Sequence, residues 1–182
     1  MVGTNGNDTL QEVTCPFPCA MFGGNGNDDI KGGPHGDSMH GGNGDDDIHG
    51  GPAGNDEGWG GDGNDDMGGD GSDDDPGNDN YRGGNGRDKL EGGTGNDRLT
   101  GDNGADIMEG GVGDDVIDDS YDEDKASEEK DTIKCGPGAD TVITQDNDGK
   151  DKIDLGNDTD IDTVTRDPGD SVSNRKGNDV VN

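Results

Sequence analysis

The fold is decided by residues 83–118, which read GGNGRDKLE, GGTGNDRLT, GDNGADIME and GGVGDDVID. These four units of nine residues follow one another without a break, and each has Gly at places one and four and Asp at place six. Place eight of every unit holds a large apolar residue. A fixed period of this kind is typical of a solenoid, in which each repeat packs only against its neighbours.

The same unit continues towards the N-terminus, although less regularly. It occurs at 3–11, 23–31, 41–49 and 60–68. The versions at 32–40 and 50–59 are irregular, and the stretch between 68 and 82 is interpreted as two compressed units. This persistence of phase argues against disorder, which the composition alone would predict.

The composition excludes several classes of protein. The 182 residues include 45 acidic and 13 basic residues, for a net charge of −32, and only 21% of them are hydrophobic. A globular domain normally has about 45–50% apolar residues, so an ordinary core is excluded. Nucleic-acid binding is excluded because it needs clustered Lys and Arg. No apolar stretch approaches the roughly 18 residues of a membrane span.

The repeated turn is suited to binding a hard cation. Glycines at places one, two and four allow positive φ and close backbone approach, which directs several carbonyl oxygens to one point beside the carboxylate at place six. Calcium takes about six to eight oxygen ligands in flexible geometry, whereas magnesium demands an octahedron. Zinc would need His or Cys, which the repeat lacks. The sequence therefore predicts multiple Ca²⁺ ions.

These units resemble the nonapeptide GGxGxDxUx of the repeats-in-toxin (RTX) family, in which U is a large apolar residue. The resemblance implies an all-β fold, a parallel β-roll or β-helix-like solenoid with two nine-residue repeats per coil. Six residues of each unit would form a calcium-binding turn and three a short strand. Calcium ions would lie between stacked turns.

Residues eighteen apart should therefore be stacked neighbours, with Asp88 over Asp106 and Asp97 over Asp115. Acidic residues at place seven, such as Asp29, are expected to face water. The predicted metal ligands are the place-six aspartates, glycines at place four, and one aspartate of the C-terminal part: Asp8, Gly26, Asp28, Asp37, Gly44, Asp46, Asp56, Gly63, Asp65, Asp73, Asp79, Gly86, Asp88, Gly95, Asp97, Gly104, Asp106, Gly113, Asp115 and Asp140.

Folding is expected to depend on the ions. One apolar side chain per repeat makes a core too thin to fold a chain of this size. Repulsion among 45 carboxylates also opposes the compact state. Calcium would supply the missing stabilisation by mass action, and the chain without it is expected to be expanded.

Three regions are expected along the chain. Residues 1–118 form the regular roll, with a Cys-containing insertion at about 11–22. Residues 119–130 read as an acidic loop, linker or short helix. Residues 131–182 are interpreted as a degenerate continuation of the solenoid with fewer ions, because Asp-x-Val/Ile recurs there at spacings near nine.

Two local features leave alternatives open. Cys15 and Cys19 could close a small disulfide loop in an oxidising compartment, could be free thiols, or one of them could pair with Cys135. Gly58 stands at an apolar place, and the adjacent Trp59 either fills the resulting gap or lies on the surface.

No catalytic motif is present, so the chain is not expected to be an enzyme. The leading hypothesis is a secreted calcium-binding protein, exported in bacterial fashion, that serves as a structural or interaction scaffold for cell-surface or matrix components. Extracellular calcium modules bind at about 10⁻⁴–10⁻³ M, which fits that location. The alternatives are a subunit that stacks end to end with copies of itself into a filament, and a C-terminal folding or secretion module of a larger enzyme, toxin or adhesin.

Overall fold

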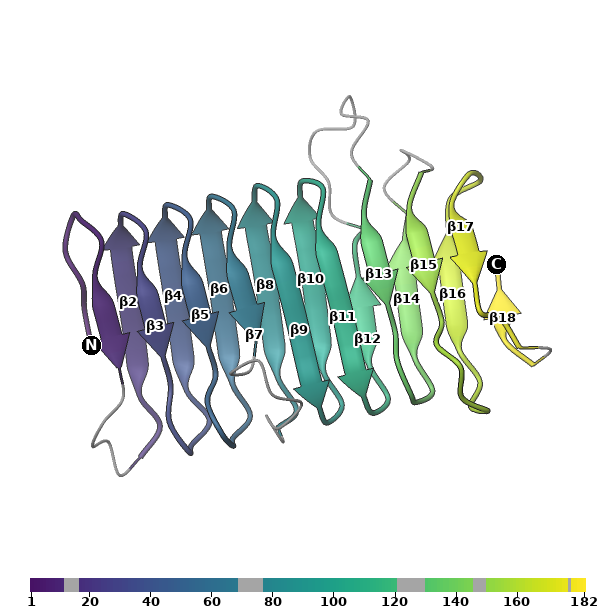
Figure 1. Cartoon of the computed structure of the whole chain (residues 1–182), viewed down its shortest axis with the longest axis horizontal. Coiled ribbons are helices and arrows are strands. Elements are labelled where there is room, and N and C mark those ends of the chain that lie inside the picture. Colours follow the sequence, from purple (N-terminus) through teal and green to yellow (C-terminus); the bar gives the residue numbers. More distant parts are fainter. Residues whose placement is uncertain (12–16, 69–76, 121–129, 146–149, 177) are drawn as a thin grey trace.

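The chain winds into a parallel β-solenoid with two flat sheets facing each other (Figure 1). The computed structural model describes residues 1–11, 17–68, 77–120, 130–145, 150–176 and 178–182. Within these residues every regular element is a strand, and successive strands alternate between the sheets. The predicted β-roll is confirmed.

Counting only the described residues, each sheet contains nine strands in parallel register. The odd-numbered sheet consists of β1 (Thr9–Gln11), β3 (Asp29–Lys31), β5 (Asp47–His49), β7 (Asp66–Gly68), β9 (Lys89–Thr94), β11 (Ile107–Val112), β13 (Thr132–Lys134), β15 (Lys152–Asp154) and β17 (Ser171–Ser173). The even-numbered sheet consists of β2 (Ala20–Asn25), β4 (Ser38–Asn43), β6 (Glu57–Asp62), β8 (Asn80–Asn85), β10 (Arg98–Asn103), β12 (Val116–Asp118), β14 (Thr141–Thr144), β16 (Thr163–Arg166) and β18 (Val180–Val181).

The strand register confirms the expected stacking of the repeats. Leu99 in β10 pairs with Tyr81 in β8 on one side and with Ile117 in β12 on the other. The neighbouring repeats contribute Leu90 and Met108, which pair with each other in the odd-numbered sheet. Residues nine apart therefore lie in opposite sheets, and residues eighteen apart are neighbours in one sheet.

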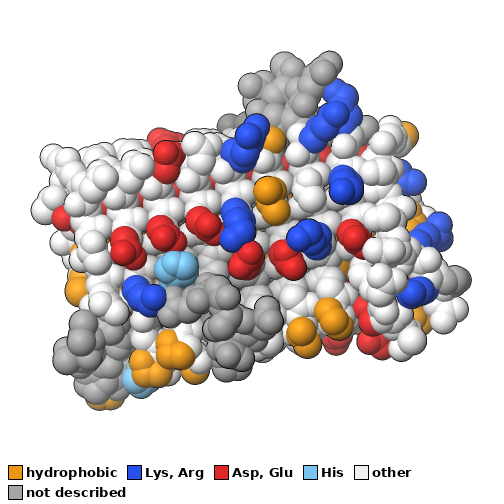
Figure 2. All heavy atoms as spheres, viewed as in Figure 1, with side chains coloured by type: hydrophobic (Ala, Val, Ile, Leu, Met, Phe, Trp, Pro, Cys, Tyr) orange, Lys and Arg blue, Asp and Glu red, His pale blue; other side chains and the backbone are white. Residues whose placement is uncertain are grey.

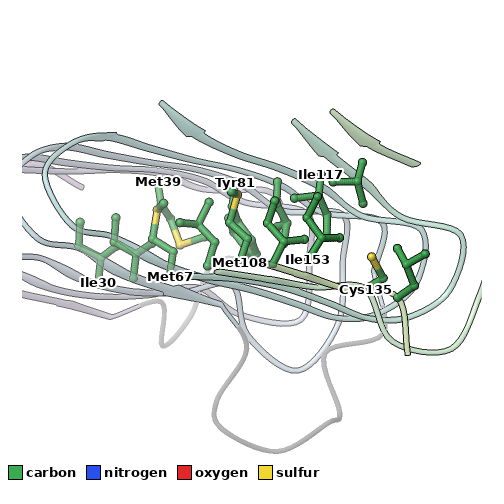
Figure 3. Packing of buried hydrophobic residues seen from close by; sticks show 14 of the residues in the cluster. Ile30, Met39, Met67, Tyr81, Met108, Ile117, Cys135 and Ile153 are labelled. Carbon is green, nitrogen blue, oxygen red and sulfur yellow. The ribbon is translucent and has the colours of Figure 1, made fainter. Parts of the chain in front are cut away.

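The core is a narrow file of place-eight side chains between the two sheets (Figure 3). Nearly every repeat contributes one buried apolar residue, from Leu10 through to Val164. Gly58 is an exception, and the ring of Tyr81 in the next coil fills its place: a Cβ on Gly58 would lie 2.7 Å from Tyr81 Cδ1. Trp59 is therefore not needed to fill this gap.

Trp59 instead lies half-buried on the outer face of the even-numbered sheet, in a stack with Phe22 and His40. The ring centroids are 4.8 Å apart for Phe22 and His40, and 4.3 Å apart for His40 and Trp59. The three residues occupy the same place in β2, β4 and β6, so the parallel register alone brings them together.

The coils differ in length because loops are inserted at the turns. Most coils contain 18–20 residues, but 23 separate Asp65 from Asp88 and 25 separate Asp106 from Asp131. The described strands on either side of this stretch belong to consecutive half-coils, because β7 pairs with β9 and β8 pairs with β6. The interpretation of 68–82 as two compressed units falls mostly on residues 69–76, which lie outside the described residues.

The solenoid continues without a change of topology through residues 131–182, as expected. Strands β13 to β18 extend the same two sheets. What changes is place one, where glycine gives way to larger side chains such as Thr144, Cys135 and Leu155, all buried. The short helix that was one alternative for 119–130 falls mostly outside the described residues.

Charge is unevenly spread along the surface. Twelve of the thirteen Lys and Arg follow residue 80. On the face shown in Figure 2, acidic side chains are accordingly joined by basic ones mainly towards the C-terminal half. Pairs such as Arg98 with Asp118 and Lys134 with Glu109 bridge adjacent coils there. Over the parts that the structure describes, no helix is long and apolar enough to cross a membrane.

Candidate metal centres: two aspartate ladders

The place-six aspartates form two continuous ladders, one along each edge of the solenoid. The first ladder lies in the turns that lead from even-numbered to odd-numbered strands and consists of Asp8, Asp28, Asp46, Asp65, Asp88, Asp106, Asp131, Asp151 and Asp170. The second ladder lies in the opposite turns and consists of Asp37, Asp56, Asp79, Asp97, Asp115, Asp140, Asp162 and Asp179. The expected pairs of Asp88 with Asp106 and Asp97 with Asp115 are both confirmed.

One oxygen of each carboxylate holds the ladder together. The backbone N–H of a ladder aspartate donates to Oδ1 of the aspartate one coil later, at 2.8 Å for Asp28 to Asp46 and for Asp97 to Asp115. The side chain thus satisfies a backbone donor that the turn would otherwise bury unpaired. This bond fixes the direction of the second carboxylate oxygen.

The second oxygen, Oδ2, meets no hydrogen-bond donor in most of the ladder. The side chains involved are almost fully buried, and burying a carboxylate without a partner costs several kcal/mol or shifts its pKa. The ladder residues whose buried Oδ2 lacks a donor are Asp28, Asp46, Asp56, Asp65, Asp79, Asp88, Asp97, Asp106, Asp115, Asp140 and Asp151.

The place-one glycine leaves open the space that Oδ2 faces. A Cβ on Gly41 would collide with Asp46 Oδ2 and would lie 2.7 Å from the carbonyl oxygen of Gly60, one coil later. Gly83 shows the same arrangement with Asp88 and Gly101. Oxygen atoms from two successive coils therefore border one small space, which only glycine keeps free.

The place-four glycines, which the sequence also singles out, shape the turn. Gly26, Gly44, Gly63, Gly86, Gly95, Gly104 and Gly113 all have φ between 115° and 145°, where an L side chain is strained. A Cβ on Gly95 would also collide with the carbonyl of Gly77 in the preceding coil. Both the conformation and the coil spacing therefore require glycine at this place.

Burial raises the pKa of several ladder carboxyls whose Oδ2 meets no donor. Desolvation, opposed by the hydrogen bond from the neighbouring backbone, raises the pKa of Asp46, Asp88 and Asp97 to about 6. The same balance raises the pKa of Asp65, Asp115 and Asp140 to about 7, with a further contribution from nearby ladder carboxylates. The ladder thus disfavours its own negative charge unless a cation neutralises it.

Calcium fits these sites on the chemistry of their donors. The groups around each space are carboxylate and carbonyl oxygens, which calcium prefers, and the ladders contain no imidazole. An unpartnered, buried Oδ2 is satisfied when a cation occupies the adjacent space. The sites repeat along the roll, which accounts for multiple ions.

Some of the predicted ligands are placed differently from the rest. Asp8 and Asp37 lie in the ladders, but Oδ2 accepts from the Thr4 backbone N–H in the first case and from Gly33 N–H at 2.8 Å in the second. These two carboxylates have less need of a cation. Asp73 lies outside the described residues, and the ladders pass directly from Asp56 to Asp79 and from Asp65 to Asp88.

Six residues of this centre were not among the predicted ligands: Asp119, Asp131, Asp151, Asp162, Asp170 and Asp179. The five ladder aspartates among them were visible in the Asp-x-Val/Ile pattern of the C-terminal part, as in residues 151–153. Asp119 occupies place one, where glycine is the rule, and its buried oxygens also lack donors. No repeat pattern could identify Asp119 as a ligand, because it departs from the repeat.

In the last coils, Oδ2 of the ladder aspartates Asp170 and Asp179 accepts hydrogen bonds from the protein itself. Oδ2 of Asp170 accepts from the Thr144 hydroxyl at 2.8 Å and from the Asp167 backbone N–H at 3.0 Å. Oδ2 of Asp179 accepts from the backbone N–H of Lys176. These two carboxylates therefore have less need of a cation.

Fold and ladders together define a calcium-binding β-roll. The family model for the RTX calcium-binding nonapeptide repeat (4 copies) matches residues 22–57 and 82–117. The chain therefore carries RTX calcium-binding repeats between residues 22 and 117, as its sequence predicted. No curated protein and no solved structure was found to match the chain.

Proposed function

We propose that this chain is a non-catalytic, secreted scaffold whose roll folds when it binds calcium outside the cell. The observation that carries the proposal is the series of buried carboxylates whose Oδ2 meets no donor. At neutral pH and above, where such groups ionise, a fold built around them is stable only while cations neutralise them. Calcium concentration would then act as the signal for folding.

Secretion is supported by two further features. Cys19 is disulfide-bonded while Cys135 is free and buried, and stable disulfides form mainly in oxidising compartments. Calcium modules outside cells bind at about 10⁻⁴–10⁻³ M, whereas cytosolic calcium sites are much tighter. A chain that folds only at the higher concentration would stay expanded until it is exported.

A scaffold is favoured over a catalyst by what the sites offer. The ladder carboxylates are buried between stacked turns, where a substrate has no access, and the outer faces of the sheets carry a mixture of charged, polar and apolar side chains. The calcium ions would therefore stiffen the roll rather than act on a substrate. The rigid outer faces would be the surfaces that meet other macromolecules.

A calcium titration of the full chain tests this proposal. Far-ultraviolet circular dichroism should show sheet forming with a midpoint in the range of about 10⁻⁴–10⁻³ M free calcium. A midpoint below about 10⁻⁶ M would contradict an extracellular folding signal. Sedimentation velocity on the same samples would separate a monomeric scaffold from an end-to-end polymer, for which the sedimentation coefficient should grow with protein concentration.

A further inference from the structure

The row of place-one residues at the first ladder contains one acidic residue. In the preceding coils this row is Gly3, Gly23, Gly41, Gly60, Gly83 and Gly101, and the next member is Asp119. The backbone of Asp119 is bonded as those glycines are: its N–H donates to Ile143 O, just as the N–H of Gly3 donates to Phe22 O. Asp119 therefore replaces a glycine without changing the course of the chain.

The Asp119 side chain stands where the preceding coils have a glycine, and it reaches the space beside Gly101 in the coil before it. It is 2% exposed, and neither Oδ1 nor Oδ2 meets a hydrogen-bond donor. A Cβ on Gly101 would lie 2.5 Å from Asp119 Oδ1 and 2.6 Å from Asp106 Oδ2. In the preceding coil, the corresponding space beside Gly83 is bordered by one carboxylate oxygen and a carbonyl.

Asp131, the next residue of the ladder, completes a group of three buried carboxylates. One oxygen from each of Asp106, Asp119 and Asp131 lies within 4.8 Å of the others. Two oxygens on opposite sides of a calcium ion are about 4.6–5.2 Å apart, because each Ca–O bond is about 2.3–2.6 Å. The separation in the structure is therefore one that a single calcium ion can span.

We propose that Asp106, Asp119 and Asp131 form a three-carboxylate calcium site that binds its ion more tightly than the ordinary ladder sites. The added carboxylate increases the negative charge around the ion, and ligand charge is one of the factors that tune calcium affinity. The site lies between the regular repeats and the C-terminal continuation, so its ion would join the two parts of the roll.

The next member of the row shows what a hydrogen-bonding residue does at this place. Thr144 is also buried, and its hydroxyl donates to Asp170 Oδ2 at 2.8 Å, which satisfies that carboxylate without a cation. An ionised Asp119 has no proton to donate and adds two acceptors. At Thr144 the neighbouring carboxylate is thus satisfied by a hydrogen bond. At Asp119 no such bond is made, and a cation is needed to neutralise the buried carboxylates.

Three variants test the site in the full chain. Asp119→Gly restores the residue of the preceding coils and should fold, while Asp119→Asn keeps the size of the side chain but removes its charge. Asp118→Asn is the matched control, because it removes one charge from the adjacent, partly exposed residue that pairs with Arg98. Calcium binding is measured by isothermal titration and by competition with a chromophoric chelator, and folding by circular dichroism in saturating calcium.

The native chain should retain about one calcium ion at chelator concentrations that remove the others. Both Asp119 variants should lose this tight class, with affinity reduced about 10- to 100-fold or more, while Asp118→Asn keeps it. An unchanged tight class in Asp119→Gly, or in a folded Asp119→Asn, would overturn the proposal and indicate that Asp119 is buried as a protonated acid. The inference relies on calcium binding by the ladders and not on the scaffold role, so a native chain that binds calcium without a tight class contradicts this site alone.

Discussion

The two oxygens of a ladder aspartate have different roles. Oδ1 accepts a backbone N–H from the adjacent coil, so a neutral amide could replace that function. Oδ2 is buried beside carbonyl oxygens and needs a positive charge. Replacing the carboxylate with an amide therefore separates the contribution of the ladder bond from that of the cation.

Asp46 and Asp47 allow this separation with a matched control. Asp46 is buried in the first ladder, whereas Asp47 beside it is exposed at place seven. Asp46→Asn should keep the bond from Asp28 N–H but raise the calcium concentration at the folding midpoint by about tenfold or more, the effect usual for removing even an outer partner of a metal. Asp47→Asn should leave the midpoint almost unchanged, as followed by circular dichroism during calcium titration. Equal shifts in the two variants would mean that calcium acts only through overall charge.

The raised pKa values of the ladder carboxyls predict opposite effects of pH with and without calcium. In the calcium-free roll, the pKa of Asp46, Asp65 and Asp115 lies at about 6 to 7 rather than at the unfolded value near 4. The contribution of these groups to the free energy of unfolding of the calcium-free roll is therefore fully present below about pH 4. It is lost as the pH rises through 6 to 7. Calcium-free protein should show more sheet at pH 4 than at pH 7.5.

With calcium present the dependence reverses, because protons compete with the ion for the same carboxylates. The calcium midpoint should rise as the pH falls from 7.5 to 5.5. Parallel titrations at the two pH values measure this shift. A midpoint independent of pH over this range would show that the ladder carboxyls titrate normally.

At the scale of a strand, each half-coil contributes one buried side chain to the core. Gly58 and Tyr81 share the space of two such residues in β6 and β8. Gly58→Leu should overpack the core and cost about 1–3 kcal/mol. Tyr81→Leu in the same chain should recover most of that loss, because Leu then occupies place eight in both strands.

Thermal unfolding in saturating calcium would measure this compensation, with Tyr81→Leu alone as the control. That single variant should be destabilised, since it leaves a cavity beside Gly58. The packing assignment would be wrong if Gly58→Leu alone were as stable as the native chain.

The strand pattern was predictable because it depends on residues within one repeat. Gly at places one and four, Asp at six and an apolar residue at eight fix the turn and the inward side of the strand, as in the repeat containing Asp97 and Leu99. The same local pattern made Asp131 and Asp140 recognisable although the turn glycines survive only in part. It could not resolve residues 68–82, where the loop length is ambiguous until the strands are paired.

The packing of Tyr81, the aromatic stack, the ladder bonds and the role of Asp119 depend on contacts between coils, which cannot be read from the pattern within one repeat. Tyr81 fills the place of Gly58 from the next coil, and Phe22, His40 and Trp59 meet only through strand register. The acceptor for each ladder N–H lies 17 to 25 residues away, a spacing that inserted loops change. Asp119 was missed for the same reason, because its partners Asp106 and Asp131 belong to different coils.

For the whole molecule, the problem is how a chain with a net charge of −32 remains compact. The core is a single file of side chains, and surface ion pairs such as Lys89 with Asp66 and Lys134 with Glu109 are exposed and contribute little each. Two rows of buried carboxylates add a further penalty unless cations lie beside them. Divalent ions placed along both edges would remove the repulsion where it is greatest and link each coil to the next.

Circular dichroism before and after removal of calcium tests this account most directly. Exhaustive dialysis against EDTA at pH 7.5 should abolish the sheet signal, and added calcium should restore it. Sodium chloride at equal ionic strength should not restore the sheet signal, because general screening of charge does not supply bonds to the carboxylate and carbonyl oxygens. A sheet signal that survives complete removal of divalent ions would contradict the central claim.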